Sequence, residues 1–188
     1  IKGFDDLRRR LDPHDRRCFG FFHPSLVDEP LIFVEVALTR DIPGSIHSVL
    51  SEARKNGNPT PAPTTAVFYS ISNCQEGLAG VSFGNFLIKR VAEELKRELP
   101  RLSTFATLSP IPGFRAWIED EEEAEALQTS LLALAAHYFL FAKAADGRPV
   151  DPVARFHLGN GARLERINWL GDVSEKGLRE AHGLMVNY

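Results

Sequence analysis

The residues of this chain whose spacing best suits chemistry are three glycines, Gly77, Gly80 and Gly84. They lie between a strand-like run, 66–72, and an apolar helical repeat that begins at Phe83. Glycine lets a ligand approach the main chain, and the first turn of a helix carries unpaired N–H groups and partial positive charge. The loop is therefore a candidate site for an anion such as a pyrophosphate. A purely structural turn has the same signature, so both interpretations stay open.

The cysteines and histidines define no site by spacing alone. Cys18 and Cys74 belong to no Cys-x-x-Cys or other metal-binding pattern, and we expect reduced thiols. Cys74 borders the glycine loop, so redox sensitivity there is an alternative. His137 is expected to be an interior residue, because it lies in a stretch rich in Leu and Ala.

Length and composition indicate a globular chain with its own core. The chain has 188 residues, of which 44% are hydrophobic, and 13 of them are Phe. This length fits one large domain, with two small ones as the less favoured alternative. The net charge of -3 argues against a nucleic-acid partner. No apolar run approaches the ~20 residues that cross a bilayer, and we expect no membrane partner.

The elements that must position these residues follow a mixed α+β order around one sheet. The segment 24–30 is expected to be a polar loop, and Arg90–Glu94 and Glu93–Arg97 to be i,i+4 ion pairs. The expected strands are 18–23, 31–38, 66–72, 105–108, 162–168 and 184–188. The expected helices are 4–11, 46–54, 83–99, 119–143, 153–158 and 175–182.

The loop before the Phe83 helix is similar to the coenzyme A pyrophosphate loop of GCN5-related N-acetyltransferases. In that family the pattern is Gln/Arg-x-x-Gly-x-Gly/Ala. With Gly84 in the last position, Ala79 stands for the Gln/Arg and Ser82 for the first Gly. The match to a generic acetyltransferase is therefore poor.

A more specific resemblance runs in order along nearly the whole chain. The segments that carry it are Phe68–Ser72, Gly80–Arg90, Leu108–Phe114, Asp151–Ala162, Arg166–Trp169, Gly183–Met185 and Asn187–Tyr188. Their most distinctive runs are Ser-Pro-Ile-Pro-Gly-Phe and Phe-His-Leu-x-Asn-Gly-Ala. Together these segments resemble the catalytic domain of the malonyl-CoA decarboxylase family.

The resemblance implies one catalytic domain over 1–188, with a GCN5-related N-acetyltransferase-like mixed β-sheet flanked by helices. It implies decarboxylation of malonyl-CoA to acetyl-CoA and CO2. The family has an N-terminal helical oligomerisation domain that this chain is expected to lack, and a homo-oligomer would form through it. A C-terminal tail is expected to be missing as well. The implied location is cytoplasmic in a bacterium, and mitochondrial or peroxisomal in a eukaryote.

The family's functional residues map onto two places in this sequence. Its catalytic Ser and His correspond to Ser109 and His157. Its coenzyme A loop corresponds to Ala79, Gly80, Val81, Ser82, Phe83, Gly84 and Asn85.

The chemistry of decarboxylation suits a Ser–His pair. Loss of CO2 leaves an enolate whose charge lies largely on the thioester oxygen, so a catalyst must donate hydrogen bonds there and protonate the carbon. His157 can do either, and Ser109 can donate a hydrogen bond or relay a proton with it. We expect no metal or organic cofactor, because the thioester is itself the electron sink and coenzyme A is part of the substrate.

Two departures and two alternatives accompany the resemblance. Animal relatives have an acidic residue where this chain has Ser82, and relatives continue past Tyr188 to a further Tyr near the site. An acetyl-CoA-dependent N-acyltransferase on the same fold would transfer acetyl to an amine without releasing CO2. A non-catalytic sensor would bind a coenzyme A ester and leave it unchanged.

A Ser–His pair is also typical of hydrolases, and a Ser before Pro is ordinarily only a turn residue.

Overall fold

The chain forms two compact units in the computed structural model, which describes residues 10, 11, 13–51, 62–78, 84–117 and 124–188. Unit 1 consists of Ile1–Pro43 and Ser48–Thr107, and unit 2 of Gly44–His47 and Leu108–Tyr188. A short helix, α2 (Ile46–Leu50), contains residues of both units. Each unit has its own cluster of buried apolar side chains. The single catalytic domain over 1–188 stays a prediction.

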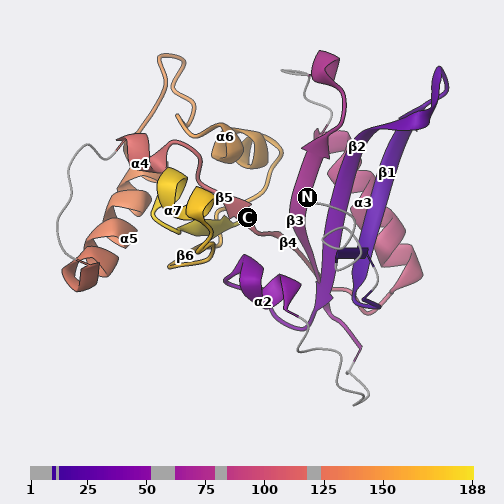
Figure 1. The fold of residues 1–188 in the computed structure, drawn as a ribbon, viewed down its shortest axis with the longest axis horizontal. Coiled ribbons are helices and arrows are strands. Elements are labelled where there is room, and N and C mark those ends of the chain that lie inside the picture. The colour runs from indigo at the N-terminus through magenta and orange to yellow at the C-terminus, as the bar shows by residue number, and fades with distance from the viewer. Residues whose placement is uncertain (1–9, 12, 52–61, 79–83, 118–123) are drawn as a thin grey trace. The chain divides into compact units, whose positions relative to one another are not determined.

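Unit 1 is built on a four-stranded sheet with the order β1-β2-β3-β4 (Figure 1). The β1–β2 and β2–β3 pairs are antiparallel, and β3 and β4 are parallel. A parallel pair needs a crossover connection, and the helix α3 (Gly84–Glu98) lies in it. The strands are β1 (Arg16–His23), β2 (Leu26–Thr39), β3 (Thr65–Asn73) and β4 (Thr104–Thr107).

The core of unit 1 lies between α3 and the sheet. Leu87, Val91 and Leu95 recur every fourth residue on α3 and are buried, as the helical repeat in the sequence predicts. They pack in one cluster with strand residues that include Val36 and Phe68. The helix ends at Glu98, two residues before Pro100.

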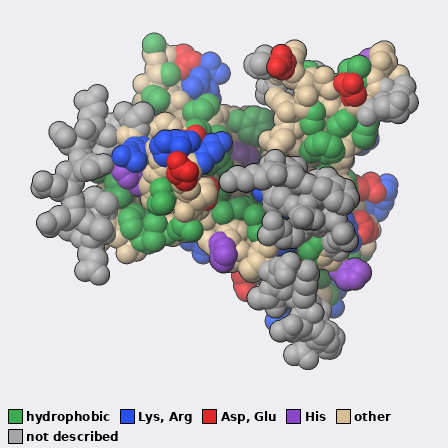
Figure 2. Space-filling view, in the orientation of Figure 1, with side chains coloured by type: hydrophobic (Ala, Val, Ile, Leu, Met, Phe, Trp, Pro, Cys, Tyr) green, Lys and Arg blue, Asp and Glu red, His purple; other side chains and the backbone are tan. Residues whose placement is uncertain are grey.

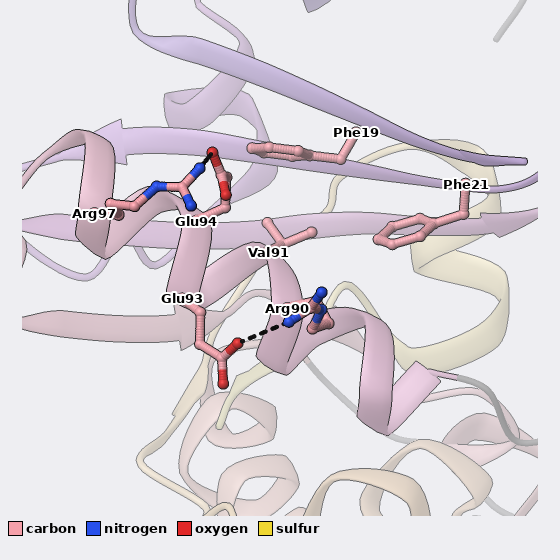
Figure 3. A pocket seen from close by; sticks show the side chains of 7 residues that line it. All are labelled: Phe19, Phe21, Arg90, Val91, Glu93, Glu94 and Arg97. Atoms are coloured by element: carbon pink, nitrogen blue, oxygen red, sulfur yellow. Dashed lines mark hydrogen bonds and ion pairs between the residues drawn. The ribbon is translucent and has the colours of Figure 1, made fainter.

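The expected i,i+4 ion pairs on α3 are wrong. Arg90 pairs with Glu93 at 3.6 Å, and Arg97 pairs with Glu94, so both pairs have i,i+3 spacing (Figure 3). Neighbours at both spacings are within reach on a helix, so the sequence alone does not choose between them. The same side chains, with Val91 and with Phe19 and Phe21 of β1, line an open groove of about 380 Å³.

Unit 2 is built on a three-stranded antiparallel sheet with the order β5-β7-β6. Its buried cluster includes Phe114, Leu131, Tyr138 and Leu184. The strands are β5 (Ser109–Pro110), β6 (Arg166–Asn168) and β7 (Met185–Asn187), and the helices are α4 (Phe114–Trp117), α5 (Ala124–Phe141), α6 (Pro152–Gly159) and α7 (Glu175–Ala181).

The predicted α+β class is confirmed, and the strands form two sheets where the sequence analysis expected one. The division falls at Leu108. Thr107 is the last residue of β4 to pair with β3, whereas Ser109 pairs with Val186 of β7. One short stretch of the sequence, 104–110, therefore supplies strands to both sheets.

Two predicted segments are wrong. The expected loop 24–30 is only a tight turn, because β2 already begins at Leu26, and Pro30 lies within the strand opposite Phe22. Proline cannot donate a ladder hydrogen bond, but the β1–β2 register shifts next to this pair, and proline is tolerated at such irregularities. The expected strand 162–168 is shorter, since only Arg166–Asn168 pair in β6.

The surface carries charges of both signs. On the face drawn in Figure 2, basic and acidic side chains lie next to one another. Among the helices that the structure describes, none is long and apolar enough to cross a membrane.

Candidate active site

Ser109 and His157 meet inside unit 2. Ser109 is the first residue of β5, and His157 lies on α6. The distance between Ser109 Oγ and His157 Nε2 is 3.4 Å, which is a long hydrogen bond. Both residues are buried, at 8% and 6% exposure. The structure thus brings together the two residues for which the family resemblance implies catalysis.

The residues at its two ends determine where the helix that carries His157 begins and ends. Asp151 is the N-cap, and its Oδ1 accepts a hydrogen bond of 2.7 Å from the Ala154 N–H, while Pro152 occupies the first turn. After the helix, the N–H groups of Asn160 and Ala162 both donate to the His157 carbonyl at 3.1 Å. Gly161 has a φ of +84°, a conformation that suits glycine. The Asn-Gly-Ala run therefore closes the helix directly behind His157.

Tyr188 covers one face of the His157 ring. The two ring centroids are 4.6 Å apart, with an angle of 22° between the planes, so the rings are stacked. Tyr188 is 6% exposed. No local pattern in the sequence indicates that Tyr188 contacts the pair.

The strand before Tyr188 is fixed by polar contacts around two buried residues, Asn168 and Asn187. Asn168 Nδ2 donates to Asn187 Oδ1 at 2.8 Å, and Arg166 Nε donates to Asn168 Oδ1 at 2.8 Å. The Glu165 N–H donates to the Asn187 carbonyl at 2.8 Å. These contacts tie β6 to β7 and so anchor the backbone next to Tyr188.

Burial sets the protonation of the His157 imidazole. It lowers the pKa of His157 from 6.5 to about 4, because the charged form loses hydration. The ring is therefore neutral at neutral pH, with one nitrogen as a donor and the other as an acceptor. In this state it can either accept a hydrogen bond from Ser109 or donate one to it.

Three acidic groups near the pair have raised pKa values. Burial raises the pKa of the Asp151 carboxyl, and its hydrogen bonds from the Ala154 and Val153 N–H groups only partly oppose this. Burial, followed by the nearby Asp151 charge, raises the pKa of Tyr138 to about 12 and also raises the pKa of Tyr188. Within the described part of the chain, Asp151 Oδ2 is buried without a hydrogen-bond partner.

We expect Asp151→Asn to be at least as stable as the wild type at pH 7, and Asp151→Ala to lose about 1 kcal/mol. Asn caps a helix as well as Asp and carries no buried charge. The raised pKa of Asp151 means that its favourable contribution is present below about pH 3.8 and is lost as the pH rises through its folded pKa. Urea unfolding at pH 7 and pH 4 measures both effects.

A matched control for the cap is Ser174→Ala. Ser174 caps α7 by accepting from the Gly177 N–H at 3.1 Å, at an exposed site and through a hydroxyl that does not titrate. Its loss should be similar at both pH values. If Asp151→Asn loses as much stability as Asp151→Ala at pH 7, the ionised carboxylate stabilises the fold and this prediction is wrong.

The other sequence-derived candidates have different outcomes. Ala79, Gly80, Val81, Ser82 and Phe83 of the expected coenzyme A loop lie outside the described residues, and Gly84 and Asn85 form the first turn of α3. Cys18 and Cys74 are both free thiols and exposed. Where the structure describes the chain, no three His, Cys, Asp or Glu side chains gather as they would around a metal ion.

The expectation that His137 is an interior residue is wrong. His137 is exposed on α5, and its ring lies 4.8 Å from that of Phe141. The buried face of the helix carries Leu131, Ala135 and Tyr138 instead.

One further pattern concerns the loop between β3 and α3. Residues Gly80 to Gly84 read Gly-Val-Ser-Phe-Gly, the Gly-x-Ser-x-Gly spacing of hydrolase nucleophile elbows, which also stand between a strand and a helix. Ser82 lies outside the described residues. An assay of function must therefore distinguish decarboxylation from thioester hydrolysis.

The fold belongs to a known class. Solved structures of a GNAT-like decarboxylase, GphF, and of the loading GNATL domain of CurA from Lyngbya majuscula superpose with TM-scores of 0.61 and 0.60, at 20% and 14% identity. The match to GphF covers 96% of this chain and 80% of that chain. The match to the CurA domain covers 97% of this chain and 79% of that chain. At such low identity the likeness shows the fold alone, which is the acetyltransferase-like fold expected from the sequence.

The chain belongs to the malonyl-CoA decarboxylase C-terminal domain family, whose profile matches residues 1–123 and 115–188. It is 37% identical to the mitochondrial malonyl-CoA decarboxylase of Anser anser anser over 100% of this chain and 46% of that protein. The crystal structure of malonyl-CoA decarboxylase from Agrobacterium vitis is 56% identical, has a TM-score of 0.91 and covers 100% of this chain and 53% of that chain. The crystal structure of malonyl-CoA decarboxylase from Rhodopseudomonas palustris is 55% identical and has a TM-score of 0.85. It covers 100% of this chain and 49% of that chain. The chain thus spans about half the length of these relatives.

Proposed function

We propose that the protein containing this chain decarboxylates malonyl-CoA to acetyl-CoA and CO2, with Ser109 and His157 at the reacting atoms. The observation that carries the proposal is the 3.4 Å contact between the Ser109 hydroxyl and the His157 imidazole in a buried site. Membership of the malonyl-CoA decarboxylase C-terminal domain family supports it. The finer assignment of malonyl-CoA as the substrate of this chain rests on that relationship.

The reaction breaks one carbon–carbon bond and consumes one proton. The bond between the substrate carboxylate and the adjacent CH2 breaks, and its electron pair moves into the thioester to give an enolate. CO2 leaves. A proton then adds to the enolate carbon, and the product is the acetyl thioester. The electron pair has a place in the thioester throughout, so the proposal needs neither a metal nor an organic cofactor.

The Ser–His pair suits the charge that develops on the thioester oxygen. A hydrogen-bond donor to such an oxyanion is worth about 3–4 kcal/mol in acyl-transfer enzymes. Neutral His157 has one N–H group and Ser109 has one O–H group, so one group can bond to its neighbour while the other faces the oxygen. The same chain of groups can pass a proton to the enolate carbon.

The remaining parts of the proposal concern recognition and assembly. The first turn of α3 and the loop Ala79 to Asn85 would hold the coenzyme A pyrophosphate through backbone N–H groups. The family resemblance supports a homo-oligomer that forms through a helical domain outside this chain. The curated relatives are mitochondrial by name, and a cytoplasmic location is proposed for a bacterial protein, with a mitochondrial or peroxisomal one for a eukaryotic protein.

The test uses the full-length protein and malonyl-CoA labelled with ¹³C in the free carboxylate. We expect labelled CO2 and acetyl-CoA to appear in equal amounts, without free coenzyme A. Free coenzyme A and malonate would identify a thioesterase. Acetylation of an added amine from acetyl-CoA, without CO2 release from malonyl-CoA, would identify an N-acyltransferase. Calorimetric binding of malonyl-CoA that stays unchanged over hours would identify a sensor. Each of these three results overturns the proposal.

A further inference from the structure

Ser109 on β5 and Tyr188, the residue directly after β7, face the same side of one sheet. Ser109 on β5 is paired directly with Val186 on β7, and directly paired residues of antiparallel strands point to one face. Tyr188 follows Val186 by two positions, which is the repeat of a strand. The sheet therefore presents both side chains to the same neighbour, and the structure shows His157 of α6 in contact with each of them.

The two contacts together fix the orientation of the imidazole. Helix α6 holds the backbone of His157, but rotation about the bond to the ring would still turn Nε2 away from Ser109. The stacked Tyr188 ring, at 4.6 Å and 22°, opposes that rotation because a turned ring would run into it. Tyr188 is itself held in place, since Asn187 before it is 0% exposed and tied to Asn168.

The groups that face His157 also bear on its protonation. Ser109 from β5 and Tyr188, directly after β7, are polar residues in contact with the ring. Asp151 heads the same helix and interacts with Tyr188 and with Tyr138 of α5. The pKa of Tyr188 is raised, so its phenol stays protonated and brings no negative charge to the imidazole. A protonated imidazole would gain a cation–π contact with the Tyr188 ring, and burial outweighs this gain because the pKa of His157 falls.

We propose that Tyr188 is a positioning residue of the active site, whose ring, stacked on the imidazole, holds His157 Nε2 toward Ser109 and keeps the imidazole out of water. The ring performs this task, and the phenol hydroxyl contributes little to it. The inference deepens the proposed decarboxylation and rests on it for its kinetic consequence. Its structural consequence, the state of the His157 ring, is independent of any substrate.

The experiment compares Tyr188→Phe, which keeps the ring, with Tyr188→Leu, which removes it, in the full-length protein. NMR titration of the His157 imidazole gives its pKa without substrate, and malonyl-CoA kinetics give kcat and KM. We expect Tyr188→Phe to match the wild type within about 3-fold in kcat. Tyr188→Leu should lower kcat by about 10- to 100-fold with KM nearly unchanged, since a displaced catalytic group costs rate more than binding. The pKa of His157 should rise toward 6.5 in Tyr188→Leu only.

The matched control is Phe139→Leu. Phe139 belongs to the same buried cluster and loses a ring of the same size, and its ring contacts that of Tyr138. It should lower the thermal midpoint as much as Tyr188→Leu while the kcat and the pKa of His157 stay as in the wild type. Tyr188→Met, a flexible side chain that fills space without a ring, replaces Tyr188→Leu if the Leu variant does not fold.

Two results would overturn the inference. One is a Tyr188→Leu protein with wild-type kcat and an unchanged His157 titration. The other is a Tyr188→Phe protein that loses as much activity as Tyr188→Leu, because the hydroxyl would then carry the role. If the wild-type protein releases no CO2, the proposed function fails, and the NMR titration of the two variants still decides whether Tyr188 positions His157.

Discussion

Replacing His157 with Ala is expected to reduce kcat for malonyl-CoA by about 10³-fold, or about 4 kcal/mol of transition-state stabilisation. The imidazole is in hydrogen-bond contact with the Ser109 hydroxyl, and it is buried. Removing it takes away a donor to the enolate oxygen and a carrier for the proton. Labelled CO2 release by the full-length variant measures the loss. Helix α6 should survive, because Ala is a good helix former and the Asp151 cap remains.

The matched control for this variant is His137→Ala. His137 also lies on a helix of unit 2, but it is exposed and its ring contacts Phe141. Its replacement should leave kcat within about 2-fold of the wild type, as surface substitutions usually have small effects. A His157→Ala protein that folds and keeps full activity would end the proposed mechanism.

The pH dependence expected for the wild-type protein follows from the neutral state of His157. Because its pKa is lowered to about 4 in the free protein, kcat/KM should show no limb from this residue near pH 6.5. The lowered pKa of His157 also makes the stability of the fold depend on pH. The unfolded chain takes up a proton at about pH 6.5 and the folded chain only near pH 4, so His157 contributes stability above pH 6.5 that is lost as the pH falls toward 4.

The Ser–His contact illustrates what sequence physics does and does not supply. Helix α6 is predictable, because Asp-Pro starts it and Asn-Gly ends it. The contact is not, because it depends on the chain leaving the first sheet after Thr107 and on β5 pairing with β7, more than seventy residues later. No local pattern encodes that pairing. The pair was named from family resemblance, and the structure gives its geometry.

The errors on other elements have physical reasons as well. Helix α5 has apolar residues on nearly all sides, so its periodicity does not tell the buried face from the one that carries exposed His137 and Phe141. Pro30 indicates a loop by its type, yet the bulged β1–β2 pair accommodates it within a strand. The stacking of Tyr188 on His157 arises from tertiary packing and has no signature in the sequence around either residue.

Replacing Ser109 with Ala is expected to lower kcat by about 100-fold, which is the usual cost of losing one donor to an oxyanion. The variant removes only a hydroxyl group from a short strand whose backbone pairing with Val186 is unaffected, so the fold should persist. Ser109→Thr keeps the hydroxyl and suits a strand, and it should recover part of the rate. Ser103→Ala, at an exposed serine before β4, is the control and should match the wild type.

The double variant Ser109→Ala with His157→Ala decides whether the two residues act as one unit. Their 3.4 Å contact means that each residue needs the other to orient its proton. Once His157 is gone, the serine hydroxyl has lost the imidazole with which it shares a proton, so a second replacement should cost little. We therefore expect the double variant to be within about 3-fold of His157→Ala, far from the roughly 10⁵-fold loss that independent effects would give. A fully additive loss in CO2 release would show that Ser109 and His157 serve separate steps, and the shared proton relay would then be wrong.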